Sequence, residues 1–172
     1  MTKMHHVWGT AAIATIAGAP VSCIIPSMFG ALVPDMDIAL GIRHRTWTHW
    51  FPFYLTAIAL TYIFVPPYSL DIPGTHLHFY IREMCLWFFY GCLLHLVEDV
   101  ITTMGIPFMQ PTGYGWSNCG EKFFKAIATG KRWTLGWTTT RGRLEGFIIS
   151  LLVVAAIFIF CYRLYLGNDI PI

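Results

Sequence analysis

Long apolar runs without a single Lys, Arg, Asp or Glu are the main pattern of the chain. They cover residues 4–34, 46–70, 100–120 and 146–162. A helix that crosses a bilayer needs about 17–25 mostly apolar residues. The pattern therefore predicts one all-α domain, residues 1–172, built as a helical bundle that crosses the membrane several times.

Three mostly apolar stretches predict spanning helices. Their expected bounds are Trp50–Val65, Tyr80–Ile101 and Glu145–Leu166. Two shorter pieces, Val7–Ala17 and Val21–Val33, come first and are separated by Gly18-Ala19-Pro20. Each piece is only ~16–20 Å long as a helix, whereas the hydrocarbon core is ~30 Å thick. The two pieces either join into one Pro-kinked span or form a hairpin of short helices that enters the bilayer and returns.

The segment Gly105–Gly142 is long and rich in Gly, Thr and Trp. Within it, Glu121–Ala128 predicts a short amphipathic helix in the headgroup plane, with Phe and Ile on one face and Lys on the other. Three tryptophans of this segment are expected in the aromatic belt at the membrane interface. They are Trp116, Trp133 and Trp137.

The composition supports a membrane protein. Of the 172 residues, 56% are apolar and 12% charged, with a formal net charge of +2, while soluble domains carry about 25% charged residues. This composition excludes a nucleic-acid-binding charge pattern, a disordered chain and a coiled coil. The five cysteines include no C-x-x-C pair, so we interpret them as small buried apolar residues.

The Lys and Arg residues indicate an orientation. If the first two pieces form a hairpin, only Arg82 and Arg163 lie on one side of the membrane. The other side then carries Lys3, Arg43, Arg45, Lys122, Lys125, Lys131, Arg132, Arg141 and Arg143. The positive-inside rule places this larger group in the cytoplasm.

Several ionisable residues are stranded in apolar sequence. They are His5, His6, Asp35, Asp37, His44, His49, His95, Asp99 and Glu145. Such groups are costly at membrane depth, so they usually pair, bind a ligand or line a cavity. His95 and Asp99 are four residues apart and share a helix face, while Asp35 and Asp37 point the same way from an extended segment. Imidazole and carboxylate without thiolate suit zinc, with manganese as an alternative.

As isolated motifs, these residues also have plainer interpretations. His95 and Asp99 alone form an interhelical hydrogen bond as readily as a ligand pair, and the two aspartates alone are more typical of a solvated loop. His44 with Arg45 alone is typical of a headgroup contact. Glu98 is expected at the surface, solvated or paired with a basic residue.

The hairpin would bring all the stranded imidazoles and carboxylates to one face of the membrane. In a single span, ~40 Å of helix would separate His6 from Asp35. A shared metal site therefore favours the hairpin.

The stretches Leu32–Asp37 (LVPDMD) and His44–His49 (HRTWTH) resemble the LPDIDH … HRGxTHS signature of the YdjM-like inner-membrane metal-dependent hydrolases. Gly91–Pro111 (GCLLHLVEDVITTMGIPFMQP) looks like that family's GYLSHxxxDxLTxxGxxxxxP segment. His6–Gly9 (HVWG) is similar to its N-terminal histidine motif, and Arg141–Glu145 (RGRLE) to its late Gly-then-Glu element. The resemblance covers nearly the whole chain, in order.

The resemblance implies an all-α fold with a clustered metal site, because the family is distantly similar to zinc-dependent phospholipases C and single-strand nucleases. The implied ligands of one to three divalent ions, most readily zinc, are His6, Asp35, Asp37, His49, His95, Asp99 and Glu145. The implied catalytic residues are Asp37 and Glu145, as general base, and His44 and Arg45, at the phosphoryl oxygens. The chain departs from the signature at Ile38, Thr46 and Trp50, where the family has His, Gly and Ser.

Together these features imply a hydrolase of the bacterial inner membrane, with its site facing the cytoplasm. It would use metal-activated water on a phosphoester in a lipid or another membrane-associated substrate. A non-catalytic membrane protein with a structural metal site and a small divalent-cation transporter are the alternatives. A metalloprotease is disfavoured because the sequence contains no H-E-x-x-H. No nucleic-acid partner is expected.

Overall fold

The structure is a computed structural model that describes residues 3–41, 44–71, 78–101, 105–107, 132–135 and 143–165. Its elements are α1 (Lys3–Ile16), α2 (Val21–Gly30), α3 (Met36–Ala39), the 3-10 helix η1 (Trp47–His49), α4 (Phe51–Phe64), β1 (Ser69–Asp71), β2 (His78–Tyr80), α5 (Ile81–Ile101), β3 (Ile106–Pro107), β4 (Arg132–Trp133) and α7 (Arg143–Tyr165). Helices form most of the described chain, as the apolar runs predict. The strands form two short antiparallel pairs, β1 with β2 and β3 with β4.

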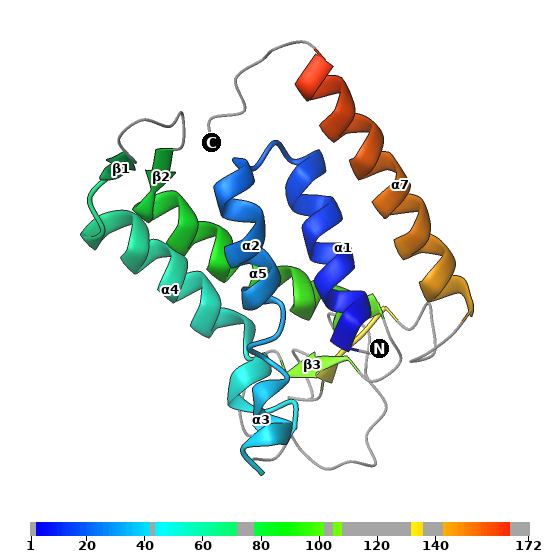
Figure 1. The fold of residues 1–172 in the computed structure, drawn as a ribbon. Helices are drawn as coiled ribbons and strands as arrows, with labels where there is room; N and C mark the ends of the chain where they lie inside the picture. Colours follow the sequence, from blue (N-terminus) through cyan, green and yellow to red (C-terminus); the bar gives the residue numbers. More distant parts are fainter. Residues whose placement is uncertain are drawn as a thin grey trace.

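The helices α1 and α2 lie side by side and run in opposite directions (Figure 1). The chain reverses at Gly18, whose φ of +82° is a left-handed conformation that residues with a Cβ rarely adopt. With 14 and 10 residues, the two helices are ~21 Å and ~15 Å long. The first apolar unit is therefore a hairpin of short helices and not one kinked helix.

The helix α2 makes its most extensive contact with α5, and the two backbones touch at a pair of glycines. A Cβ on Gly30 would run into the carbonyl of Phe88, and a Cβ on Gly91 into the carbonyl of Ser27. Small residues allow such close approach between helices in a membrane, where packing holds helices together. The crossing places the end of α2 against the half of α5 that carries the ionisable residues.

The helices α4 and α7 flank this centre, α4 packed on α5 and α7 packed on α1 (Figure 1). The larger apolar core lies between α4 and α5 and consists of Tyr54, Cys92, Leu96, Val100 and Ile106. By length and composition, α5 and residues 146–163 of α7 can each cross a membrane. The third expected span, α4, has 14 residues and is only ~21 Å long, so it falls short of the other two.

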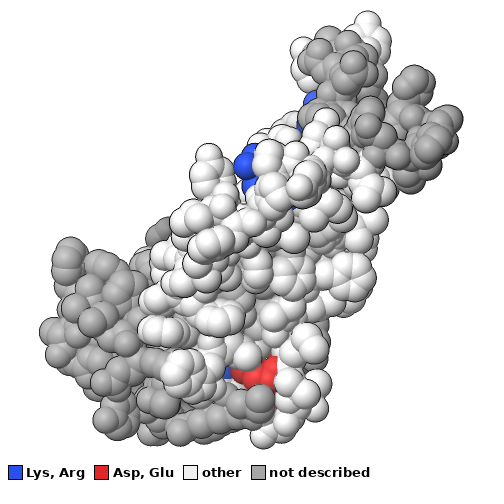
Figure 2. Space-filling view, turned by 90° about the vertical axis from the view of Figure 1, so that its left-hand side faces the viewer, with Lys and Arg blue, Asp and Glu red and all other residues white. Residues whose placement is uncertain are grey.

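The outer surface of the helices is largely apolar. Figure 2 shows a face with almost no charge, apart from a basic area towards its upper end and a small acidic spot towards its lower end. Large apolar side chains stand out from the bundle, such as Phe64 of α4 and Phe158 of α7, which are 73% and 72% exposed. So much exposed apolar surface suits contact with hydrocarbon better than contact with water.

The described cysteines only partly match the expectation of small buried residues. Cys23 and Cys92 are fully buried, whereas Cys161 is exposed on α7. Cys85 is intermediate, and the four described cysteines are free thiols.

Some predicted features lie outside the described residues. These are the amphipathic helix of residues 121–128, Trp116 and Trp137, together with the side chains of Trp133 and Glu145. Of the long segment 105–142, the described parts are the two strands β3 and β4 and their neighbours. There the Leu135 N–H donates to the carbonyl of Val100 over 2.7 Å, which joins the strand pair to the end of α5.

Candidate metal centre

Five ionisable side chains from different parts of the chain meet at one end of the bundle. They are His6 of α1, Asp35 before α3, His49 of η1, and His95 and Asp99 of α5. Their exposed fractions run from 0% to 8%. The neighbouring His5 is partly exposed, so α1 turns His6 towards the centre. The structure thus brings these five predicted ligands together.

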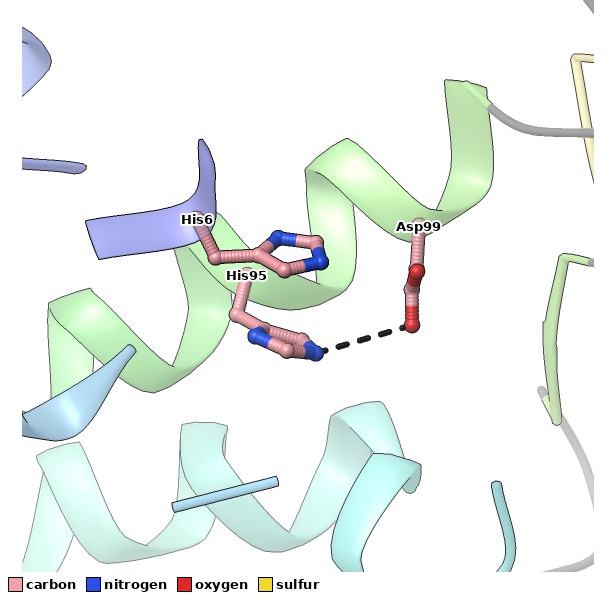
Figure 3. Close-up of side chains that lie close together, drawn as sticks. All are labelled: His6, His95 and Asp99. Atoms are coloured by element: carbon pink, nitrogen blue, oxygen red, sulfur yellow. Dashed lines mark ion pairs between the residues drawn. The ribbon is translucent and has the colours of Figure 1, made fainter. Parts of the chain in front are cut away.

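The rings of His6 and His95 lie one above the other beside Asp99 (Figure 3). The ring centroids are 3.8 Å apart, and the ring planes differ by 24°. Nε2 of His95 lies 3.6 Å from Oδ2 of Asp99, the pair joined by the dashed line in Figure 3. One ligand atom from each of the three residues lies within 4.8 Å of the others, which makes this group a first candidate ion position.

A second group of the same kind consists of Asp35, His44 and His49. The two groups adjoin, because Oδ1 of Asp35 is 3.6 Å from Nε2 of His95, and Nε2 of His49 is 3.3 Å from Oδ2 of Asp99. The side chain of His44 is 24% exposed, unlike the other candidate ligands. The centre is therefore open on the side of His44.

The distances between the histidine Nε2 atoms and the carboxylate oxygens suit shared cations better than direct hydrogen bonds. The distances from Nε2 atoms to carboxylate oxygens are 3.3 to 3.8 Å, beyond the usual range of about 2.7–3.2 Å for an N–H···O bond. Two ligands of one tetrahedral zinc ion, each ~2.0–2.1 Å from the metal, lie ~3.3–3.4 Å apart. Among the buried side-chain atoms that the structure describes, Nε2 of His49 and Nε2 of His95 have no hydrogen-bond partner. The donor set and its spacing thus fit a divalent metal.

In all four histidines of the two groups the other ring nitrogen, Nδ1, has a polar partner of its own. The contacts are His6 with the Glu98 carboxylate (2.6 Å), His44 with the Asp37 carboxylate (2.9 Å), His49 with the Thr48 hydroxyl (3.1 Å) and His95 with the Ala31 carbonyl (2.7 Å). When a ring carries a single proton, on Nδ1, the lone pair of its Nε2 is available for a metal. Metal-binding histidines are typically fixed in this way.

Asp37 organises the loop between α3 and α4. Its Oδ2 atom accepts hydrogen bonds from the Arg45 N–H (3.1 Å) and the Thr48 hydroxyl (2.7 Å). Burial opposes ionisation of this carboxyl, but the His49 ring 3.5 Å away and hydrogen bonds from Thr48 and His44 outweigh burial and hold its pKa well below the usual range. The two ligand groups that the described residues form do not include Asp37. Its role as a ligand or general base stays a prediction.

His49 lies among three carboxylates. Burial alone would lower its pKa, but the carboxylates of Asp35, Asp37 and Asp99, whose oxygens lie 3.3 to 3.7 Å from its ring nitrogens, outweigh burial and raise the pKa to about 10. The carboxylates therefore favour a positive charge at this position, either a proton on His49 or a metal ion.

Arg45 is buried, with 5% of its surface exposed, and its side chain is turned into the protein. Its Nη2 donates to Oδ1 of Asp99 over 2.6 Å, and its Nη1 donates to the Gly105 carbonyl over 2.9 Å. The backbone of Arg45 has a φ of +60°, a left-handed conformation that is strained for a residue with a Cβ. The guanidinium thus fixes Asp99 from behind, and its expected contact with a phosphoryl oxygen stays a prediction.

The expectation that Glu98 lies at the surface is wrong. Glu98 is 9% exposed, and its carboxylate accepts the hydrogen bond from His6. Neighbouring residues on a helix diverge by ~100°, which keeps Glu98 off the face that carries Asp99, but α1 covers this second face. The sequence carries no signal that would have found this contact. In the structure Gly9, one turn after His6, leaves room for it, because a Cβ there would meet the Glu98 carboxylate.

Glu145 lies in the first turn of α7, and its side chain is outside the described residues. The next residue, Gly146, lines a groove together with His5 and Trp8 of α1. The start of α7 therefore lies beside the start of α1. Glu145 as a ligand or base stays a prediction.

Comparison with known proteins gives one match. Residues 1–168 fit the family model described as YdjM inner membrane protein. No curated protein and no solved structure matches the chain. The family description names a membrane and no reaction, so hydrolysis stays a prediction.

Proposed function

The chain belongs to the YdjM inner membrane protein family, and we propose that it is a multi-pass, metal-dependent hydrolase of a phosphoester in a lipid or another membrane-associated substrate. The observation that carries the proposal is the set of four histidines, each bound at Nδ1 and each within one of the two ligand groups. Partners behind a histidine orient its ring and increase its basicity as a ligand. An ordinary apolar contact between helices does not require such a partner at each histidine.

Two ion positions follow from the ligand groups. His6, His95 and Asp99 would hold one ion, and a second would be held by the group of Asp35, His44 and His49. Nitrogen and oxygen ligands of this kind suit zinc, with manganese as the alternative. A bound divalent ion supplies activated water at neutral pH and positive charge for phosphoryl oxygens.

The surrounding residues orient the substrate and limit access of water. His44 lies on the open side of the centre, where a phosphoester would approach, and its ring is fixed by the 2.9 Å hydrogen bond to Asp37. Asp35 belongs to the second group and also adjoins the first, because its Oδ1 lies 3.7 Å from His49 and 3.6 Å from His95. The other described members of the two groups are buried, so the substrate would enter from the His44 side.

Exposed apolar side chains in the stretch of chain that carries Asp35, His44 and His49 support a lipid substrate. They are Met36, Ile38, Leu40 and Trp47, which are between 50% and 66% exposed. Exposed apolar side chains beside a buried polar centre are typical of a surface that meets lipid. The depth of the centre follows if Arg82 and Glu83 mark the outer interface, because the helix from Glu83 to Glu98 spans ~22 Å, less than the ~30 Å hydrocarbon core. The centre would therefore lie just beneath the headgroups of the cytoplasmic leaflet, on the side that carries most Lys and Arg residues.

The test combines metal analysis with hydrolysis by the purified full-length protein. We expect at least one equivalent of zinc or manganese in the wild type and loss of that metal in His95→Ala. Glu83→Gln, at the other end of α5, should keep the metal. The wild type, reconstituted into phospholipid vesicles, should release phosphorylated headgroup or free phosphate, whereas His95→Ala should release neither.

Metal-free wild-type protein that keeps its full thermal stability in chelator would overturn the proposal. Bound metal without hydrolysis of vesicle lipids or of soluble phosphoesters would favour a structural metal site. Hydrolysis of soluble phosphoesters but not of vesicle lipids would contradict the proposal that the substrate is a lipid.

A further inference from the structure

The carboxylate of Glu98 is held between two residues of α1, His6 and Gly9. From this contact we propose that Glu98 is a positioning residue of the metal centre, which acts through His6 and does not itself bind the ion. The inference rests on the metal binding included in the proposed function. It assigns a role to a carboxylate that the sequence pattern indicated only as a surface group.

The hydrogen bond between the two helices is short and buried. Oε2 of Glu98 accepts from Nδ1–H of His6 over 2.6 Å, and the side chains are 11% and 3% exposed. Hydrogen bonds to a carboxylate are shorter and roughly twice as strong as those between neutral groups. The bond joins residues that are 92 positions apart, so it ties the start of α1 to the end of α5.

Gly9 leaves room on α1 for the carboxylate of Glu98. Gly9 follows His6 by three residues and therefore lies on the same side of α1, one turn later. A Cβ at Gly9 would collide with Oε1 of Glu98. One oxygen of Glu98 thus lies against the helix backbone while the other holds the histidine.

The consequence concerns the second nitrogen of His6. A carboxylate at Nδ1 keeps the proton there, so Nε2 carries the lone pair and lies on the side of Asp99 (Figure 3). The same carboxylate increases the electron density of the ring and fixes its angle. His6 also stacks on His95 at 3.8 Å, so an error in its orientation would disturb both ligands of the first ion position. Partners of this kind change metal affinity by roughly 10–100-fold when they are removed.

The experiment measures metal affinity of the full-length protein in detergent by competition with a coloured chelator, using Zn²⁺ and Co²⁺. We expect Glu98→Gln to weaken binding by about 10–100-fold and to change the visible absorption spectrum of bound Co²⁺. Gly9→Ala, which displaces the carboxylate without removing it, should act in the same direction. Glu83→Gln is the matched control on the same helix and should leave affinity and spectrum unchanged.

A double-mutant cycle separates positioning from general stability. If Glu98 acts through His6, adding Glu98→Gln to His6→Ala should weaken metal binding no further than His6→Ala alone. Additive losses, or wild-type affinity and spectrum in Glu98→Gln, would overturn the inference. If Glu98→Gln does not fold, Gly9→Ala alone and combined with His6→Ala gives the same comparison. Failure of the wild type to bind either metal would instead overturn the proposed function.

Discussion

Arg45 donates from Nη2 to Oδ1 of Asp99 over 2.6 Å and so joins two residues that are 54 positions apart. Both side chains are buried, with exposed fractions of 6% and 2%. The other oxygen of Asp99, Oδ2, lies 3.3 Å from His49 and 3.6 Å from His95. The ion pair therefore sets the direction in which a candidate ligand faces the metal centre.

Loss of this ion pair should destabilise the fold. We expect Arg45→Ala to lower the free energy of unfolding by about 3–5 kcal/mol, because the Asp99 charge stays buried without its cation. Arg82→Ala is the matched control, since Arg82 and Glu83 form a pair whose side chains are 25% and 30% exposed. Loss of that pair should cost only ~0–1 kcal/mol. Chemical unfolding in detergent, followed by circular dichroism, measures both variants, and equal losses would contradict the expectation.

Replacement of Asp99 itself should remove metal more completely than replacement of its neighbour. Asp99→Asn keeps the size of the side chain but removes an anionic ligand, whereas Glu98→Gln changes a residue that acts through His6. Elemental analysis of the purified variants, with Glu83→Gln as control, measures retained metal directly and needs no substrate. A larger loss in Glu98→Gln than in Asp99→Asn would mean that the wrong carboxylate has been assigned to the ion.

The helices could be predicted because they depend on local sequence, and most of the candidate ligands because they stand in short motifs of characteristic spacing. Stretches of more than ~17 mostly apolar residues predict α5 and α7. The break at Gly18 predicts two short pieces, and the shared metal site favours their arrangement as a hairpin. The strands β1–β4 have two or three residues each, too few to produce an alternating pattern. The predicted span of residues 50–65 proved to be a 14-residue helix, which apolar composition alone does not distinguish from a full span.

The residues that stand behind the ligands could not be predicted in the same way. The contact of Glu98 with His6 depends on where α1 packs against α5, and helix periodicity specifies only that Glu98 and Asp99 face different directions. The inward turn of Arg45 depends likewise on Asp99 and on the carbonyl of Gly105. Motif spacing identifies residues that act on a common ligand, but it does not show which of them support the others.

Metal affinity should rise with pH. His49 has a pKa of about 10 among its three carboxylates, so at pH 7 it carries a proton that must leave before Nε2 can bind a metal. Burial lowers the pKa of His44 despite its hydrogen bond to Asp37, so His44 is neutral at pH 7 and releases no proton. We expect the apparent affinity to increase by about tenfold per pH unit from pH 7 to pH 9, with about one proton released. Titration calorimetry in buffers of different ionisation enthalpy measures this proton, and an affinity independent of pH would contradict the expectation.

The glycines at the close crossing of α2 and α5 should not tolerate replacement by a residue with a side chain. In Gly91→Ala the new Cβ would run into the Ser27 carbonyl and push the helices apart. The Ala31 carbonyl, which holds His95 at 2.7 Å, would move with α2. We expect the free energy of unfolding to fall by about 1–3 kcal/mol. We also expect the variant to lose bound metal. Gly146→Ala is the control, because within the described structure no atom lies within 4 Å of its Cβ, and its stability should stay constant or rise by up to about 1 kcal/mol.

Both ends of the α1–α2 hairpin should be accessible from the cytoplasm, whereas its turn should be accessible from neither side of the membrane. The helix α1 has 14 residues and is ~21 Å long, so the turn at Gly18 would stop inside a hydrocarbon core of ~30 Å. In a cysteine-free background we expect Met4→Cys and Leu40→Cys, at sites 58% and 66% exposed, to react with an impermeant maleimide only in inside-out vesicles. Ala17→Cys, at the exposed turn, should react in neither vesicle orientation because lipid surrounds it. Labelling of the first two positions from opposite sides would contradict the hairpin in the membrane and separate His6 from the centre.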